Sequence, residues 1–211
     1  MKNFSALFLI LILSSCQQKN QNTNIPSASE TSAIHKDTHT EAMDKGFVIL
    51  KNTYRQKDFI SIYNKDHSLW KSFQMNDTFR DEEIIPYTMK PENTLLIFTS
   101  LGKENGFYKV LVNENKNTIK YIKESDPNFI YQTLAEHVAT VFAVDFNEKE
   151  NPLRKEPEDH AQSVPSDKDS FYYPVKTKGN WLMVQDDNEQ SFWIKWCDEQ
   201  GHLILELYYD A

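Results

Sequence analysis

The chain has 211 residues, and its 23 Lys and Arg against 31 Asp and Glu give a formal net charge of −8 at pH 7. Nucleic-acid-binding proteins usually carry a basic surface that neutralises phosphates. This sequence offers only sparse cations, such as Lys176 and Lys178. We therefore expect no nucleic-acid partner and no charge-driven attraction to anionic lipid head groups.

The first residues carry a short apolar run behind a single cation. Residues 6–13 are eight consecutive apolar side chains after Lys2, whereas a membrane-spanning helix needs about 20. This pattern predicts a signal peptide over residues 1–15. The stretch Leu13-Ser14-Ser15-Cys16 resembles the lipobox of bacterial lipoproteins. The resemblance implies cleavage before Cys16, lipidation of Cys16 and a mature charge near −9, because Lys2 is lost.

Lipidation implies a location. One acyl chain binds a membrane only marginally, and the resemblance implies three, so we expect a lipid anchor in the cell membrane or outer membrane with the globular part outside the cytoplasm. Only Cys197 then remains as a free thiol, and no internal disulfide can form. The core must therefore be sufficient by itself, and 13 Phe, 10 Tyr and 4 Trp supply large apolar side chains for it.

Residues 16–45 are expected to be the lipidated cysteine and a linker. Residues 17–44 contain no aromatic side chain and are rich in Gln, Asn, Ser and Thr, a composition typical of a disordered tether. The alternating acids and histidines of "HKDTHTE" (35–41) could ligate a metal only by ordering this tether, so we predict no metal site and no cofactor.

From residue 46 the sequence favours strands. Residues 46–137 are expected to form an N-terminal β-rich domain, with strand candidates at 47–50, 58–63 and 94–100 and a hairpin at Asn105-Gly106. After Asp126-Pro127, the segment 128–138 predicts one short helix with Asp126 as its cap. Residues 138–211 form the expected second domain, where several short strands around a long loop favour a small barrel over a sandwich.

Two stretches of the chain can be aligned. Trp181 lies 73 residues after Tyr108, and Trp193 lies 72 residues after Tyr121, which favours two modules of similar plan. The segments "NPLRKEP" (151–157), "PVKTKGNWLMV" (174–184) and "FWIKW" (192–196) resemble bacterial SH3-like domains, although Phe192 stands where that family usually has glycine. The resemblance covers residues 138–211 and more faintly 47–125. It implies a mainly β fold with two small SH3-like barrels in tandem, joined by one short helix.

No motif for catalysis stands out. Cys197 and His202 are the closest Cys and His in the sequence, but a nucleophilic thiolate needs a stabilising cation or helix start and an oriented histidine. Cys197 instead lies between Trp196 and Asp198 in a predicted hairpin. We find no phosphate-binding loop, no nucleophile elbow and no metal-ligand spacing outside the linker. We therefore predict that the protein is not an enzyme; an unrecognised hydrolase stays an alternative.

Aromatic side chains supply the binding hypothesis. In "SFWIKW" (191–196) Phe192, Ile194 and Trp196 share one strand face, so Trp193 is expected to point outward on the other. The resemblance implies a groove that binds peptide, either from peptidoglycan or from an envelope protein. The candidate ligand-binding residues are Trp193, Trp181, Tyr172, Tyr173, Arg154 and Asn151. An alternative for Trp181 and Trp196 is that they only pack inside a small barrel. A separate alternative for the protein is a structural lipoprotein, or one that inhibits a wall-degrading enzyme.

Overall fold

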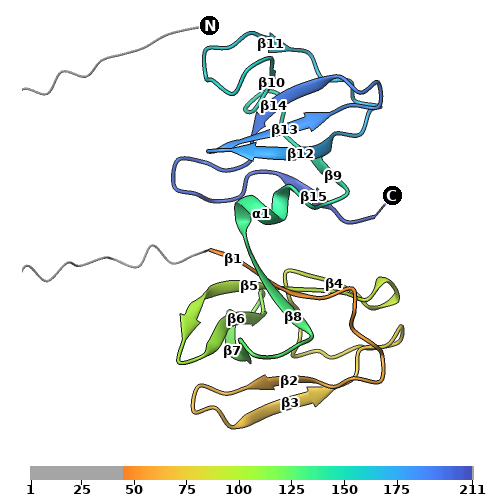
Figure 1. The fold of residues 1–211 in the computed structure, drawn as a ribbon, viewed down its shortest axis with the longest axis vertical. Helices are drawn as coiled ribbons and strands as arrows, with labels where there is room; N and C mark the ends of the chain where they lie inside the picture. Colours follow the sequence, from red (N-terminus) through yellow and green to blue (C-terminus); the bar gives the residue numbers. More distant parts are fainter. Residues whose placement is uncertain (1–44, 211) are drawn as a thin grey trace, which may run out of the picture. The chain divides into compact units, whose positions relative to one another are not determined.

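The computed structural model describes residues 45–210, and these residues are mainly β with one short α-helix (Figure 1). The mainly β expectation is confirmed. The signal peptide, Cys16 and the expected linker up to Asp44 lie outside the described residues. Within the described range, no helix is long and apolar enough to span a membrane.

The N-terminal strands form one antiparallel sheet. Its order is β3-β2-β7-β6-β5-β1-β8, with β4 paired to β5. Its elements are β1 (Gly46–Leu50), β2 (Ile60–Tyr63), β3 (Leu69–Phe73), β4 (Thr88–Lys90), the 3₁₀ turn η1 (Pro91–Asn93), β5 (Leu95–Glu104), β6 (Phe107–Asn113), β7 (Thr118–Lys123) and β8 (Phe129–Thr133). No pairing joins the end strands β3 and β8 in the described part of the chain, so this sheet is not a closed barrel.

The C-terminal strands form two smaller sheets. A five-stranded sheet has the order β11-β10-β14-β13-β12, and β15 pairs with β9. The elements are α1 (Leu134–Val138), β9 (Ala143–Asp145), β10 (Leu153–Arg154), β11 (Ser163–Val164), β12 (Tyr173–Lys178), β13 (Trp181–Gln185), β14 (Ser191–Lys195) and β15 (Glu206–Tyr208). These sheets are also open, so the expected pair of closed barrels is not found.

The two aligned stretches both form antiparallel hairpins. Asn105 and Gly106 adopt φ values of 51° and 80° between β5 and β6, as a two-residue hairpin turn requires. The expected hairpin at this position is therefore confirmed. In the second stretch Gly179, with φ 56°, precedes β13, which pairs with β14. The sheets around the two hairpins nevertheless differ in strand number and order.

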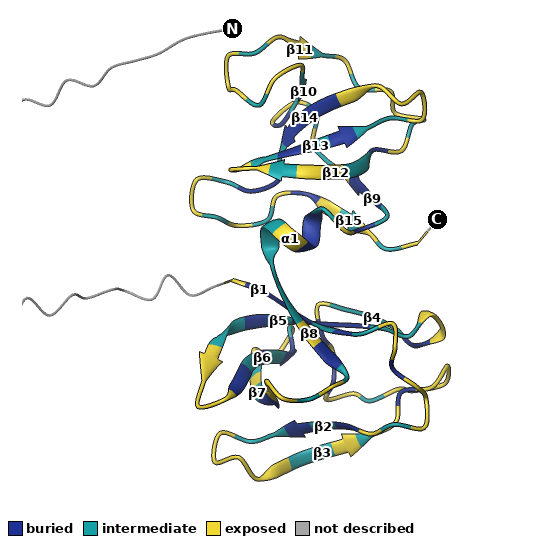
Figure 2. Ribbon diagram, viewed as in Figure 1, coloured by how far each residue is buried: buried dark blue, intermediate teal, exposed yellow. Residues whose placement is uncertain are grey.

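Two separate hydrophobic clusters lie beneath these strands. One uses side chains between Val48 and Tyr131, and the other uses side chains between Leu134 and Tyr209. Figure 2 shows the buried residues concentrated on the strands and the exposed residues mostly in the connecting loops. All described residues fall within the compact unit 40–211. The expected domain boundary at 137/138 stays a prediction.

The expected helix over 128–138 is only half right. Residues 129–133 form β8, and only Leu134–Val138 are helical. The cap is Thr133, whose hydroxyl accepts a hydrogen bond from the Glu136 amide while the Glu136 carboxylate accepts one from the Thr133 amide. Asp126 instead closes a turn with the Asn128 amide. The β-branched and aromatic side chains of β8 suit the pairing with β1, which overrides the local helical signal.

Candidate functional site

Trp193 does not point into solvent. Its side chain is only 7% exposed, and it belongs to β14, which is paired on both sides with β13 and β10. Phe192, Trp193 and Ile194 are all buried, so this strand is covered on both faces rather than on one. The predicted outward orientation of Trp193 is therefore wrong.

Asn151 and Arg154 contact the backbone of their own module. The Asn151 amide donates to the Lys195 carbonyl at 2.8 Å and accepts from the Lys195 amide at 2.9 Å. It is 8% exposed. Half-buried Arg154 donates from Nη1 to the Ala161 carbonyl at 2.8 Å. Asn151 thus holds the loop after β9 against β14, and Arg154 holds the connection between β10 and β11. Their role in ligand binding stays a prediction.

Trp181 is half-buried and already has a cation on its ring. The Lys195 ammonium lies 5.5 Å from the ring centroid and forms an ion pair with Asp159 at 2.5 Å. The ring face that could receive a ligand is therefore shared with an internal partner. Trp181 is not among the residues that line the hollow described next.

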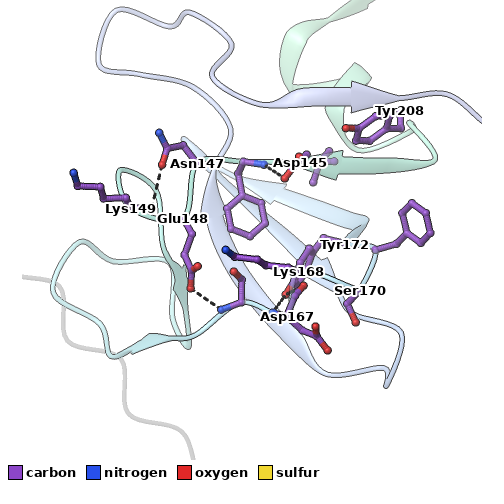
Figure 3. A pocket seen from close by; sticks show the side chains of 13 residues that line it. Asp145, Asn147, Glu148, Lys149, Asp167, Lys168, Ser170, Tyr172 and Tyr208 are labelled. Carbon is purple, nitrogen blue, oxygen red and sulfur yellow. Dashed lines mark hydrogen bonds between the residues drawn. The ribbon is translucent and has the colours of Figure 1, made fainter.

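An open hollow of about 690 Å³ lies in the C-terminal module (Figure 3). Three segments line it: the end of β9 with the loop after it, the segment before β12, and the end of β15. The lining residues are Val144, Asp145, Phe146, Asn147, Glu148, Lys149, Ser166, Asp167, Lys168, Ser170, Phe171, Tyr172 and Tyr208. Of the predicted ligand-binding residues, only Tyr172 lines this hollow.

Aromatic rings form the apolar part of the hollow. Tyr172 is buried and packs edge-to-face on Phe146, with ring centroids 5.2 Å apart. Phe171 and Tyr208 are 50% and 37% exposed. Phe171 also contacts Tyr173 at 6.2 Å between centroids, so Tyr173 adjoins the site without lining it. A fixed buried ring and two exposed rings therefore offer apolar contact area to a ligand.

Three carboxylates in the hollow are held by backbone amides. Asp145 accepts from the Phe146 amide at 2.7 Å, Glu148 from the Ser166 amide at 2.8 Å, and Asp167 from the Asp169 amide at 3.0 Å. The bonds from Ser166, together with the charge of Lys168, lower the pKa of Glu148. Glu148 therefore stays ionised at neutral pH. It ties the loop after β9 to the segment before β12.

The tyrosine hydroxyls of the hollow lie in a negative field. Burial raises the pKa of Tyr172, and the charges of Asp167, Asp186 and Glu148 raise it further. Desolvation likewise raises the pKa of Tyr208, as do the charges of Glu206 and Asp145. Both phenols therefore stay protonated and can donate hydrogen bonds.

The Cys197 and His202 side chains do not form a nucleophile and base pair. Burial raises the pKa of the Cys197 thiol, and the charge of Asp198 raises it further, which keeps the thiol protonated. His202 instead places Nδ1 2.9 Å from the Asp198 carboxylate. Among residues 45–210, no group of three or more His, Cys, Asp or Glu side chains could hold a metal ion.

Sequence reasoning missed most of the hollow. Phe146, Phe171 and Tyr208 are far apart in sequence, and only the fold brings them together. One available signal was the spacing of polar residues in "SDKDS" (166–170), which is typical of a turn capped by aspartate. Comparisons of the chain with protein-family models, with curated proteins and with solved structures found no match.

Proposed function

We propose that the protein is a non-catalytic lipoprotein of the cell envelope whose C-terminal module binds extended peptide in the hollow. The observation that carries the proposal is the exposure of Phe171 and Tyr208 beside the fixed ring of Tyr172. Exposed aromatic side chains next to ordered polar groups are typical of binding surfaces. The lipid anchor at Cys16 rests on the sequence alone.

The dimensions and the lining suit a peptide. Ligand sites usually enclose about 300 to 1,000 Å³ and combine apolar rings with a few placed polar groups, and the hollow has about 690 Å³. The Tyr208 hydroxyl and the carboxylates of the lining can pair with peptide amides. The ligand class we propose is a cell-wall peptide or a segment of an envelope protein.

The module is also proposed to be SH3-like. In that family a long loop precedes the central strands. Here the long segment between β9 and β12, which also contains the two-residue strands β10 and β11, supplies Glu148 and Asp167 to the lining of the hollow. Aromatic residues of SH3-like grooves receive extended peptides. We still propose that Tyr172 and Tyr173 lie beside the ligand. The exposed aromatic side chain that contacts the ligand is now proposed to be Phe171 instead of Trp193, which is buried.

The test is retention of the purified protein by cell-wall sacculi, compared with capture of peptide-bearing proteins from an envelope extract. The variant is Phe171→Ala, and the matched control is Phe59→Ala, an aromatic side chain that is 61% exposed and directly precedes β2. We expect the parent and Phe59→Ala to be retained and Phe171→Ala to be lost. Equal retention of both variants would contradict the hollow as the site. Retention by neither material would contradict peptide binding.

A further inference from the structure

We propose that the hollow selects its peptide through a cationic side chain, which the Asp145 and Asp167 carboxylates receive beside the exposed rings. This inference deepens the proposed function and rests on it. The ligand group is an ammonium or guanidinium carried by the peptide. Three observations support it: the free carboxylate oxygens, the position of Lys168 and the exposed rings.

The first observation is the state of the carboxylates. Asp145 and Asp167 each use Oδ1 to accept a backbone hydrogen bond, at 2.7 and 3.0 Å. Within the described part of the chain, neither Oδ2 atom has a hydrogen bond or ion pair. Both residues are exposed. Each carboxylate is thus oriented by the protein and keeps one oxygen for a ligand, and charge-assisted bonds to such oxygens are stronger than neutral ones.

The second observation is Lys168, an internal cation that lines the same hollow. Figure 3 shows its side chain extending across the hollow toward Glu148, whereas Lys149 points away from Tyr172. The charge of Lys168 contributes to the lowered pKa of Glu148. Its ammonium forms no hydrogen bond or ion pair with any of residues 45–210. Lys168 therefore acts on Glu148, and within residues 45–210 no cation forms an ion pair with Asp145 or Asp167.

The third observation concerns the rings and the remaining charges. Phe171 and Tyr208 are exposed, and a cation over an aromatic face is attracted by the ring electrons. Three carboxylates line the hollow, against the two lysines Lys149 and Lys168, and the Lys149 side chain points away from Tyr172. An acidic ligand would meet these like charges, so charge complementarity selects a basic peptide.

The test uses the detergent-purified full-length protein and three short capped alanine peptides that differ only at the central residue, which is lysine, norleucine or glutamate. We expect the lysine peptide to bind about tenfold more tightly than the norleucine peptide at low salt, from two partly exposed ion pairs and a ring contact. This preference should shrink at high salt because the charges are exposed. The glutamate peptide should bind most weakly.

The decisive variant is the double substitution Asp145→Asn with Asp167→Asn. Asparagine keeps the Oδ1 acceptor of both backbone hydrogen bonds and removes both charges, so the loops should stay folded while the lysine preference disappears. Lys168→Gln should strengthen binding of the lysine peptide by about threefold. The control is Glu199→Gln, which removes an exposed acid outside the lining and should change nothing.

The outcomes separate the two proposals. Equal binding of the lysine and norleucine peptides by the parent would overturn cation selection and leave peptide binding intact. A lysine preference that survives the double substitution would overturn the assignment to Asp145 and Asp167. Failure of every peptide to bind the folded parent would overturn the proposed function together with this inference.

Discussion

The Tyr172 hydroxyl lies 2.8 Å from the amide nitrogen of Asp167, which donates a hydrogen bond to it. The same hydroxyl donates to the Asp167 carbonyl at 3.3 Å, so one buried phenol fixes both backbone groups of a residue that lines the hollow. The backbone of Tyr172 makes a second connection, because its carbonyl accepts a hydrogen bond from the Val144 amide at 3.0 Å. Tyr172 therefore connects two of the three segments that form the site.

The first prediction is that Tyr172→Phe loosens the loop while keeping the fold. The ring still packs on Phe146, but the Asp167 amide loses its acceptor, at a cost of about 0.5 to 1.5 kcal/mol. Amide exchange at Asp167 should accelerate, and peptide retention should fall. Tyr54→Phe is the matched control, because the Tyr54 hydroxyl accepts from the buried Met75 amide at 2.9 Å, within the hydrophobic cluster of the N-terminal sheet. It should reduce stability without affecting retention.

The second prediction concerns Trp193. Because its side chain is 7% exposed, Trp193→Ala should destabilise the protein by about 3 to 5 kcal/mol through lost contacts and a cavity. Urea unfolding followed by circular dichroism measures this loss. Ile194→Ala, at the fully buried neighbouring position, should behave similarly. A Trp193→Ala protein that is as stable as the parent but no longer binds the ligand would contradict the buried position of Trp193 and favour an exposed, ligand-contacting one.

The misplacement of Trp193 shows what alternation in a single strand can and cannot determine. The alternation of side chains along a strand correctly assigns residues to its two faces, but the prediction also assumed that one of these faces is exposed to solvent. Whether that face is covered depends on how the rest of the fold packs around β14, and even its neighbour in the sheet, β10, is distant in sequence. The hairpin at Asn105-Gly106 was predictable because its cause lies within the turn itself.

The hollow was hard to predict for a related reason. Tyr172 and Tyr173 were candidates because they were expected to border the same groove as Trp193, yet the exposed rings of Phe171 and Tyr208 come from positions 37 residues apart. No local pattern links those positions. They line one hollow because β15 pairs with β9 and because Val144 of β9 bridges to Tyr172, the residue after Phe171. The mainly β class follows from local propensities, whereas the site follows from strand pairing.

The third prediction tests the cap of α1. Thr133→Ala removes the hydroxyl that accepts from the Glu136 amide at 3.2 Å, and loss of such a cap costs about 1 kcal/mol. The melting temperature should fall by a few degrees, and amide exchange at Glu136 should accelerate. Thr140→Ala is the control, since Thr140 lies beyond the helix and its hydroxyl donates to the His137 carbonyl in the last turn instead of accepting from a first-turn amide. Equal effects of both substitutions would contradict a specific capping role.

The fourth prediction concerns the membrane anchor. Cys16→Ser removes the expected lipid acceptor, so the protein should move from the membrane fraction to the soluble fraction. Fractionation followed by a high-salt wash measures this change. Cys197→Ser is the control, because that thiol is buried in the fold and should not affect partitioning. Mature Cys16→Ser protein that still sediments with washed membranes would contradict lipid anchoring.

The fifth prediction is a loss of stability in mild acid that depends on His137. The buried His137 ring places Nδ1 2.9 Å from the Gln132 amide oxygen and Nε2 3.0 Å from the Tyr209 hydroxyl, with the Phe47 ring centroid 4.7 Å away. Burial lowers the pKa of His137 from 6.5 to about 4. The folded state therefore holds the ring neutral where the unfolded chain would protonate it.

The direction of this pH dependence follows from proton linkage. Between pH 6.5 and about 4 the unfolded state binds more protons at this site, so the free energy of unfolding falls as the pH falls. The full stabilisation is present above pH 6.5, and about 3 kcal/mol is lost by pH 4. Urea midpoints across this range should show the slope in the parent and in His202→Gln, whose histidine is exposed. His137→Gln should flatten the slope, because glutamine has no proton to gain; an unchanged slope would assign the acid sensitivity to other groups.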